Sequence, residues 1–232
     1  DELFIDGVLS SLTPIILGGL ALLKSNLLYI GPGGSMLLDS SVQNSRTWTC
    51  TSQMGIHNLA IHGSLKAGRL MNHINSSQGW DSLYTNTTGL VEFESEDVFY
   101  VNHLQIDGRM VVFSPIIMVA FVPDKGLEMY IGGTVILDAL ASHPLGPWSG
   151  QSNITADLIS TSTSSRFDTG NTVWMVKELI VGGTLNSQPT EEVKVIIFRV
   201  KGTGVATFTI NINLKSANLN IEAGGVLDLD FR

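Results

Sequence analysis

Three side chains of this sequence have the chemistry needed for acid–base catalysis: an imidazole, a carboxylate and a guanidinium group. His62 and Asp107 occupy the same position of a short repeated unit, and Arg109 follows two residues after Asp107. A carboxylate beside an imidazole is the pairing that general acid–base catalysis uses. If the two units stack on each other, the three side chains share one patch. The alternative, which we favour, is a solvated polar face without catalytic activity.

Other catalytic, metal and cofactor motifs are missing from the sequence. Asp39 and Asp138 each end an apolar run, where a single carboxylate usually stabilises a turn. His, Cys and carboxylate residues do not occur at zinc or EF-hand spacing, and the Gly-Gly pairs do not follow the dinucleotide-binding pattern. No nucleophile elbow surrounds Ser164 or His143. The sequence therefore predicts no metal and no cofactor, and it favours a protein that is not an enzyme.

Three N-glycosylation sequons occur, at Asn75, Asn86 and Asn153. None of them lies in a glycine-containing repeat strand, so we expect all three to face solvent from loops. If the protein passes through a eukaryotic secretory pathway, these are the expected glycosylation sites.

The tryptophans raise the question of glycan binding, because all four lie in or near expected loops. Exposed indole rings could stack on sugars, which would make glycans a further partner. The alternative, which we favour, is that these rings cover strand edges and the ends of the molecule. The residues are Trp48, Trp80, Trp148 and Trp174.

The elements that would position these residues come from a seven-residue repeat. Its pattern is Leu/Ile/Met, any residue, Ile/Val, any residue, Gly, any residue, Leu/Met/Val. In a strand, positions one, three, five and seven point to the same face. Three of them are large and apolar and the fourth is glycine, as expected where a strand bends sharply over a narrow core. Strict matches are LFIDGVL (3–9), LAIHGSL (59–65), LQIDGRM (104–110), MYIGGTV (129–135) and LIVGGTL (179–185).

The repeat makes two structural predictions. Ile61, Ile106, Ile131 and Val181 should occupy equivalent inward positions in one interior column. The glycines two residues after them should sit at bends and resist bulky substitution; they are Gly63, Gly108, Gly133 and Gly183.

The uneven spacing of the units favours a parallel β-helix, whose connecting loops can have any length. LVEFESEDVFYV, VKVIIFRV and ATFTININ have the β-branched and aromatic content of further strands. Residues 142–150 and 160–172 are rich in Gly, Pro, Ser and Thr and predict long loops. Leu12–Leu23 could form a capping element.

On these repeats the chain resembles the right-handed parallel β-helix class, which includes pectate-lyase-like enzymes, phage tailspikes and extracellular surface proteins. GSMLLDS (34–40) and GTVILDA (133–139) are also similar to strings in the G8 modules of animal cell-surface proteins. The resemblance implies an all-β fold. In enzymes of this class, acidic residues and an arginine on one outer face act on polysaccharide, which is a second reason to consider His62, Asp107 and Arg109.

Composition limits the possible partners and compartment. The net charge is −8 and the Lys and Arg residues are scattered, which disfavours nucleic acid. The apolar run Leu12–Leu23 is too short for a transmembrane segment. We interpret residues 1–232 as a single β-helix domain or a segment of a longer one. Cys50 is the sole cysteine, so no internal disulfide can form.

Three functions remain open. We favour a non-catalytic structural or adhesive module of an extracellular or cell-surface protein, associating with itself or with neighbouring chains end to end. The first alternative is a polysaccharide lyase or hydrolase on a β-helix. The second is a viral capsid or spike protein with an antiparallel β-sandwich or jelly roll, in which the glycine units would be hairpin bends. Strand direction distinguishes the last of these from the other two.

Overall fold

The computed structural model describes most of the chain and consists of β-strands and their connections. The described residues contain no helix. They are residues 2–4, 8–11, 15–18, 22–39, 53–67, 80–93, 97–113, 115–120, 122, 124–137, 151–188, 192–209 and 213–230.

The described strands form two parallel sheets. Sheet A has 12 strands: β1 (Glu2–Phe4), β2 (Val8–Ser11), β4 (Leu22–Ile30), β6 (Gln53–Ile61), β8 (Trp80–Thr85), β10 (Asp97–Ile106), β12 (Ile116–Val119), β13 (Glu128–Ile131), β15 (Ser152–Thr161), β17 (Thr172–Val181), β19 (Glu192–Val200) and β21 (Asn213–Ile221). Sheet B has 10 strands: β3 (Ile15–Gly18), β5 (Ser35–Asp39), β7 (Ser64–Ala67), β9 (Leu90–Phe93), β11 (Arg109–Val112), β14 (Thr134–Leu137), β16 (Arg166–Thr169), β18 (Thr184–Ser187), β20 (Val205–Thr209) and β22 (Val226–Asp230).

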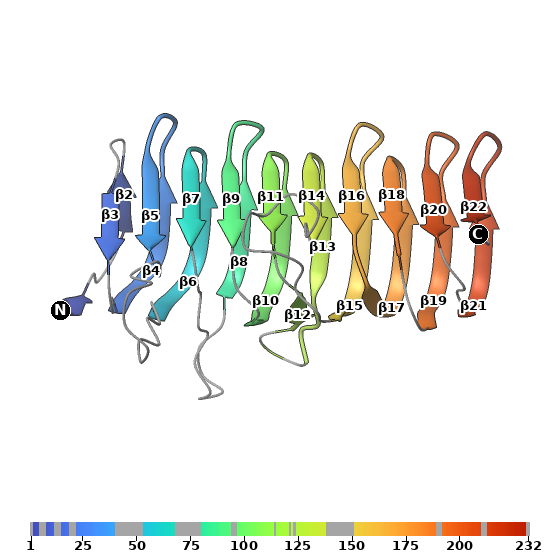
Figure 1. The fold of residues 1–232 in the computed structure, drawn as a ribbon, viewed down its shortest axis with the longest axis horizontal. Helices are drawn as coiled ribbons and strands as arrows, with labels where there is room; N and C mark the ends of the chain where they lie inside the picture. Colours follow the sequence, from blue (N-terminus) through green and yellow to red (C-terminus); the bar gives the residue numbers. More distant parts are fainter. Residues whose placement is uncertain are drawn as a thin grey trace.

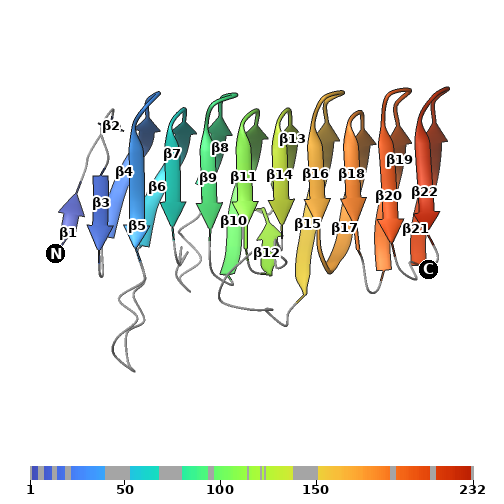
Figure 2. The same ribbon diagram turned by 45° about the horizontal axis from the view of Figure 1, so that its top comes forward.

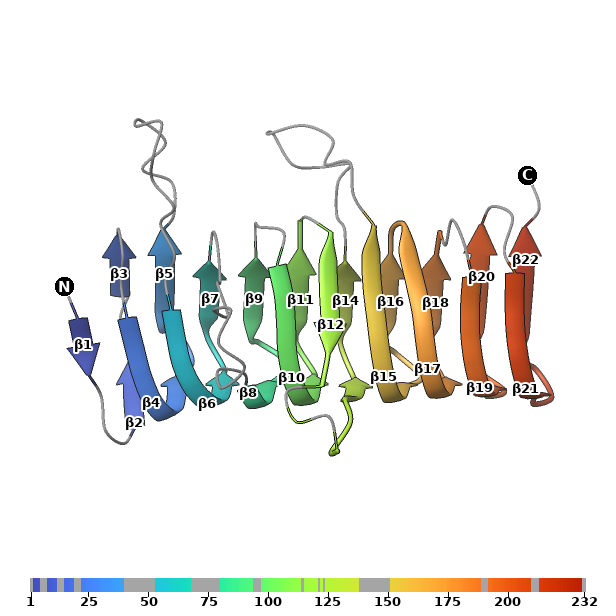
Figure 3. The same cartoon turned by 90° about the horizontal axis from the view of Figure 1, so that it is seen from below.

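The chain alternates between the two sheets and so winds into an elongated solenoid. From β4 onward, each rung consists of the sheet A strand or strands, a corner, and the sheet B strand that follows. Successive rungs lie side by side from β1 at one end to β22 at the other (Figure 1). Turning the molecule shows the two sheets as separate layers with the rungs stacked in register (Figures 2 and 3). The predicted parallel β-helix is confirmed.

Every strand pairing in the described residues is parallel, which contradicts the jelly-roll alternative. That alternative placed hairpin turns at the Asp-Gly pairs. Instead, Asp107 and Gly108 lie at the corner where the chain leaves sheet A and enters sheet B. At this glycine unit the chain therefore passes from sheet A to sheet B, and the two halves of the unit do not pair with each other.

The predicted interior column is confirmed. Ile61, Ile106, Ile131 and Val181 are each at most 1% exposed and follow one another through the register of sheet A. Burying a side chain of this size contributes roughly 1.5–3 kcal/mol. Two threonines interrupt the apolar series, Thr85 between Ile61 and Ile106, and Thr161 between Ile131 and Val181.

These two buried threonines are hydrogen-bonded to the corner of the next rung. Gly108 N donates to Thr85 Oγ1 at 3.0 Å, and Gly182 N donates to Thr161 Oγ1 at 3.0 Å. A buried hydroxyl in an apolar core is tolerated when it has such a partner. Here the hydroxyls accept from backbone N–H groups at the bend.

The corner glycines are required by the closeness of the preceding rung. A Cβ added to Gly133 would lie 2.0 Å from Gly108 O, and one added to Gly108 would lie 2.2 Å from Gly89 O. Neither glycine has the left-handed φ that favours glycine. The predicted bends are therefore confirmed, and the reason for glycine is contact with backbone oxygen.

One strict match to the repeat is not a corner. Within residues 3–9, Leu3 pairs with Leu23 and Leu9 pairs with Leu28, both in β4. Both described ends of this match therefore lie beside β4 within sheet A, and its residues 5–7 lie outside the described residues.

One other prediction about connections is wrong. Residues 160–172 do not form a long loop, because they include the end of β15, a short turn, all of β16 and the start of β17. Within Leu12–Leu23, Ile15–Gly18 is the end strand of sheet B and Leu22 begins β4, and a capping role for this segment stays a prediction. The predicted loop at 142–150 lies outside the described residues.

Candidate functional site

The structure does not bring the predicted catalytic side chains together. The rung formed by β8 and β9 lies between the His62 corner and the Asp107 corner. His62 is therefore two rungs from Asp107, roughly 9–10 Å at the usual strand spacing. The condition for a shared patch, direct stacking of the two units, is not met. A catalytic role for His62, Asp107 or Arg109 stays a prediction.

The imidazole of His62 packs between two tyrosines on the outer face of sheet A. Its ring meets Tyr29 edge-on at a centroid distance of 5.0 Å and Tyr84 at 5.8 Å. Tyr29 Oη and His62 Nδ1 are 3.3 Å apart. Because Ala60 lies between the two tyrosines in register, the histidine ring fills the space above it.

Asp107 and Arg109 lie on opposite sides of one corner. Gln105 Nε2 donates to Asp107 Oδ2 at 3.0 Å. Arg109 is exposed in β11, with Leu90 and Thr134 as its neighbours in register. This carboxylate is thus held by an amide on its own strand.

A different imidazole–carboxylate pair does form, at His103 and Glu128. His103 Nδ1 lies 3.7 Å from Glu128 Oε2, and the His103 ring is 5.2 Å from that of Tyr130. Tyr130 Oη donates to Glu128 Oε2 at 3.3 Å. Partial burial and the charge and hydrogen bond of Glu128 raise the pKa of Tyr130, so its phenol stays protonated and donates.

The repeat contained a signal for this pair that sequence reasoning missed. His103 and Glu128 each precede the first position of a glycine unit, at Leu104 and Met129. Equivalent positions of neighbouring rungs lie side by side, so the two residues are register partners. Their side chains are nearly half exposed, at 43% and 46%.

The two tryptophans in the described residues lie in the interior. Trp80 and Trp174 are both fully buried, in β8 and β17. Both interpretations of these residues, as exposed sugar-stacking rings and as covers for strand edges, are therefore wrong. Trp48 and Trp148 lie outside the described residues.

The sequons have different environments. Asn86 lies in the short turn between β8 and β9, where Thr88 N donates to Asn86 Oδ1 at 3.1 Å. Asn153 is in β15, not in a loop, and is flanked in register by Ile117 and Val173. Its Oδ1 is buried without a hydrogen-bond partner. Asn75 lies outside the described residues.

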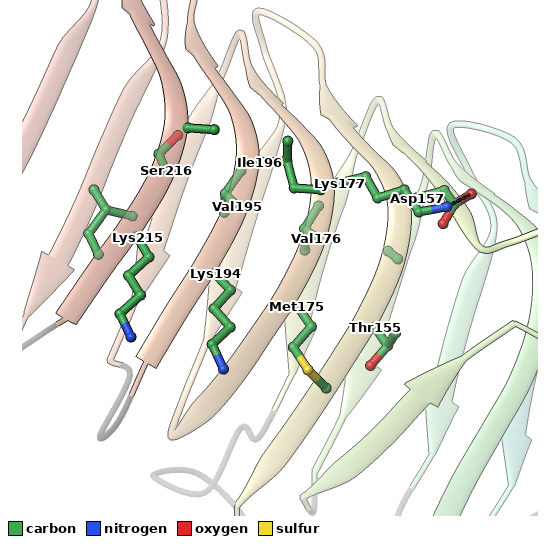
Figure 4. Close-up of a pocket in the computed structure, with 13 residues that line it drawn as sticks. Thr155, Asp157, Met175, Val176, Lys177, Lys194, Val195, Ile196, Lys215 and Ser216 are labelled. Atoms are coloured by element: carbon green, nitrogen blue, oxygen red, sulfur yellow. Dashed lines mark hydrogen bonds and ion pairs between the residues drawn. The ribbon is translucent and has the colours of Figure 1, made fainter.

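A groove of about 720 Å³ crosses the outer face of sheet A over β15, β17, β19 and β21. One wall follows the register from β15 to β21 (Figure 4). Its residues are Thr155, Met175, Lys194 and Lys215.

The groove lies where the strands of sheet A interrupt the regular alternation of inward-facing and outward-facing side chains. In β17, Met175 and Lys177 are exposed, but the next residue, Glu178, also faces outward before Leu179 returns to the core. β15 and β19 show the same irregularity at equivalent positions. The second wall is formed here, by Asp157, Lys177, Ile196 and Ala217.

Lysines give this groove a basic rim with nearby carboxylates. Lys177 Nζ is 2.9 Å from Asp157 Oδ2, and Lys177 points toward Asp157 in Figure 4. Glu192 pairs with Lys194 at 2.6 Å and also with Lys215. Hydrogen bonds from these two ammonium groups lower the pKa of Glu192, which keeps the carboxylate ionised.

The described residues contain neither a metal-binding cluster of three His, Cys, Asp or Glu side chains nor a helix that could span a membrane. Comparison with known proteins finds no matching family, curated protein or solved structure.

Proposed function

We propose that this chain is a non-catalytic structural module of an extracellular β-helix protein and that copies of it associate end to end. The observation that carries the proposal is the last described rung. Leu219 and Ile221 are 50% and 44% exposed, although their register partners Phe198 and Val200 are fully buried. Among the described residues, nothing covers the core side chains of this rung.

The backbone at the same end supports the proposal. β21 pairs with β19 and β22 pairs with β20, and no described strand lies on their other sides. Unpaired edges of parallel strands are templates for further strands, and here they border exposed apolar side chains. A second copy stacked in parallel would bury both. Because this contact joins unlike ends, it would build a filament.

The extracellular part of the proposal rests on surface chemistry. Asn86 presents a sequon in a turn, and only 15% of residues are charged. The two G8-like strings overlap sheet B strands at equivalent positions, with Met36 of β5 and Val135 of β14 in one interior column. This equivalence supports a relation to the repeats of pectate-lyase-like and G8-containing surface proteins.

The association can be tested with Ile221→Asp. We expect sedimentation velocity to show larger assemblies of the unmodified chain as its concentration rises, because association buries the apolar side chains of the end rung. A carboxylate at position 221 should remain in water and oppose that burial. We expect the variant to stay monomeric over the same concentration range.

Val226→Asp is the matched control. Val226 is in the same rung and is similarly exposed, at 46%, but it lies in an outward column of sheet B. It should leave association unchanged. A chain that stays monomeric at high concentration, or equal effects of the two substitutions, would show that the end rung does not mediate assembly.

Glycosylation provides a separate test of the extracellular assignment. In protein isolated from its native source, we expect a glycan on Asn86 and much lower occupancy at Asn153. The reason is that Asn153 lies within a sheet strand with its Oδ1 buried. Site-resolved mass spectrometry measures both occupancies. An unmodified Asn86 would count against secretion while leaving the fold intact.

A further inference from the structure

The groove over β15, β17, β19 and β21 combines exposed apolar side chains with ammonium groups. We propose that it binds a single anionic amphiphile, a molecule with an elongated apolar body and one negatively charged head group. The proposal does not depend on end-to-end assembly, because the groove is on the outer face of sheet A.

The apolar body would be held by Met175 and Ile196. They come from opposite walls of the groove and are 41% and 54% exposed, although most large apolar side chains among the described residues are buried. The groove floor is formed at Ala156, Val176 and Val195. Covering Met175 and Ile196 removes apolar surface from water, which favours binding.

The charged head group would be held at Lys194 and Lys215. These lysines occupy neighbouring rungs and share Glu192, so among the described residues two ammonium groups face one carboxylate. On the other wall, Lys177 is neutralised by Asp157. The whole chain carries a net charge of −8, whereas the charge at Lys194 and Lys215 is positive. This local positive charge attracts an anion.

The size of the groove suits one such molecule. Its volume of about 720 Å³ lies within the range of ordinary small-molecule sites. The groove crosses four strands, which gives it an elongated floor along the solenoid axis. An alkyl chain lying along that axis would pass Met175 and Ile196 and bring its head group to Lys194 and Lys215.

The test uses dodecanoate as the probe, below the concentration at which it forms micelles. Isothermal titration calorimetry on the full chain should show saturable binding that weakens with added salt. The double variant Lys194→Gln/Lys215→Gln should bind about tenfold more weakly, because the charge-assisted contacts to the carboxylate are lost. Ile196→Asp should weaken binding similarly, by repelling the head group and removing apolar contact.

The control variant is Lys66→Gln, which removes a lysine paired with Glu92 on sheet B, away from the groove. It should bind dodecanoate like the unmodified chain, and circular dichroism should show that all variants keep the β-fold. Dodecyl maltoside, with the same tail and no charge, should bind at least tenfold more weakly than dodecanoate.

Three outcomes would overturn the proposal: no saturable dodecanoate binding, equal binding by the groove variants and Lys66→Gln, or equal binding of dodecyl maltoside. Equal binding of a charged oligouronate without an apolar body would also overturn it, because charge alone would then explain recognition. All four outcomes can be interpreted even if the chain does not associate end to end, because the binding measurements do not require assembly.

Discussion

Gly133→Val is expected to lower the free energy of unfolding by about 3 kcal/mol or more. The added Cβ would overlap Gly108 O at 2.0 Å and Asp107 O at 2.4 Å. Both are backbone atoms of the preceding rung, so they cannot rotate away as a side chain would. Gly108 O also accepts from Thr134 N at 2.8 Å, and moving it would break this ladder hydrogen bond.

Chemical denaturation measures this effect, with Thr134→Val as the control. Thr134 is the next residue, is half-buried on sheet B and already has a branched side chain, so valine there should change stability by less than about 1 kcal/mol. If Gly133→Val had an unfolding midpoint equal to that of the control, the steric explanation of the corner glycine would be wrong.

Trp174→Ala should destabilise the protein by about 3–5 kcal/mol, since it removes a fully buried indole from the core. The ring packs edge-to-face on Phe167 at 5.6 Å, and its Nε1 donates to Ser187 Oγ at 3.1 Å. Alanine would leave a cavity beside Phe167 and remove one donor from a buried hydroxyl.

Met175→Ala is the control for this variant. Met175 is the adjacent residue on the same strand but points outward and is 41% exposed, so its truncation should cost below about 1 kcal/mol. The two variants can be compared by thermal or denaturant unfolding. Similar midpoints for Trp174→Ala and Met175→Ala would contradict the assignment of Trp174 to the core.

The sequence by itself determined the parallel β-helix and its interior column. Side-chain alternation and the glycine unit are local properties. Both can be recognised in the sequence around Ile106 and Gly108 without knowing which rungs lie next to them. The glycine recurs because each corner lies against the backbone of the preceding rung, so the same steric demand returns with every similar corner. A repeated local constraint leaves a repeated sequence pattern.

Only the tertiary structure decided which rungs are neighbours. The rung of β8 and β9 carries Thr85 where other units have Ile or Val, and it turns through four residues to Leu90. It therefore escaped the repeat pattern, although it separates His62 from Asp107. In this longer turn a backbone N–H group is hydrogen-bonded within the turn itself, from Gly89 N to Asn86 O. The pattern could not reveal a rung that does not share it.

The groove was equally inaccessible to sequence reasoning. Its walls depend on the change in alternation between Lys177 and Glu178, where two successive side chains face outward. Its basic rim depends on Glu192 reaching Lys215 across the ladder. The residues that line the groove are spread over four strands, and only the register of sheet A makes them adjacent. Contacts between rungs are set by stacking and by connections of variable length, whereas the fold class is set by local alternation and sterics.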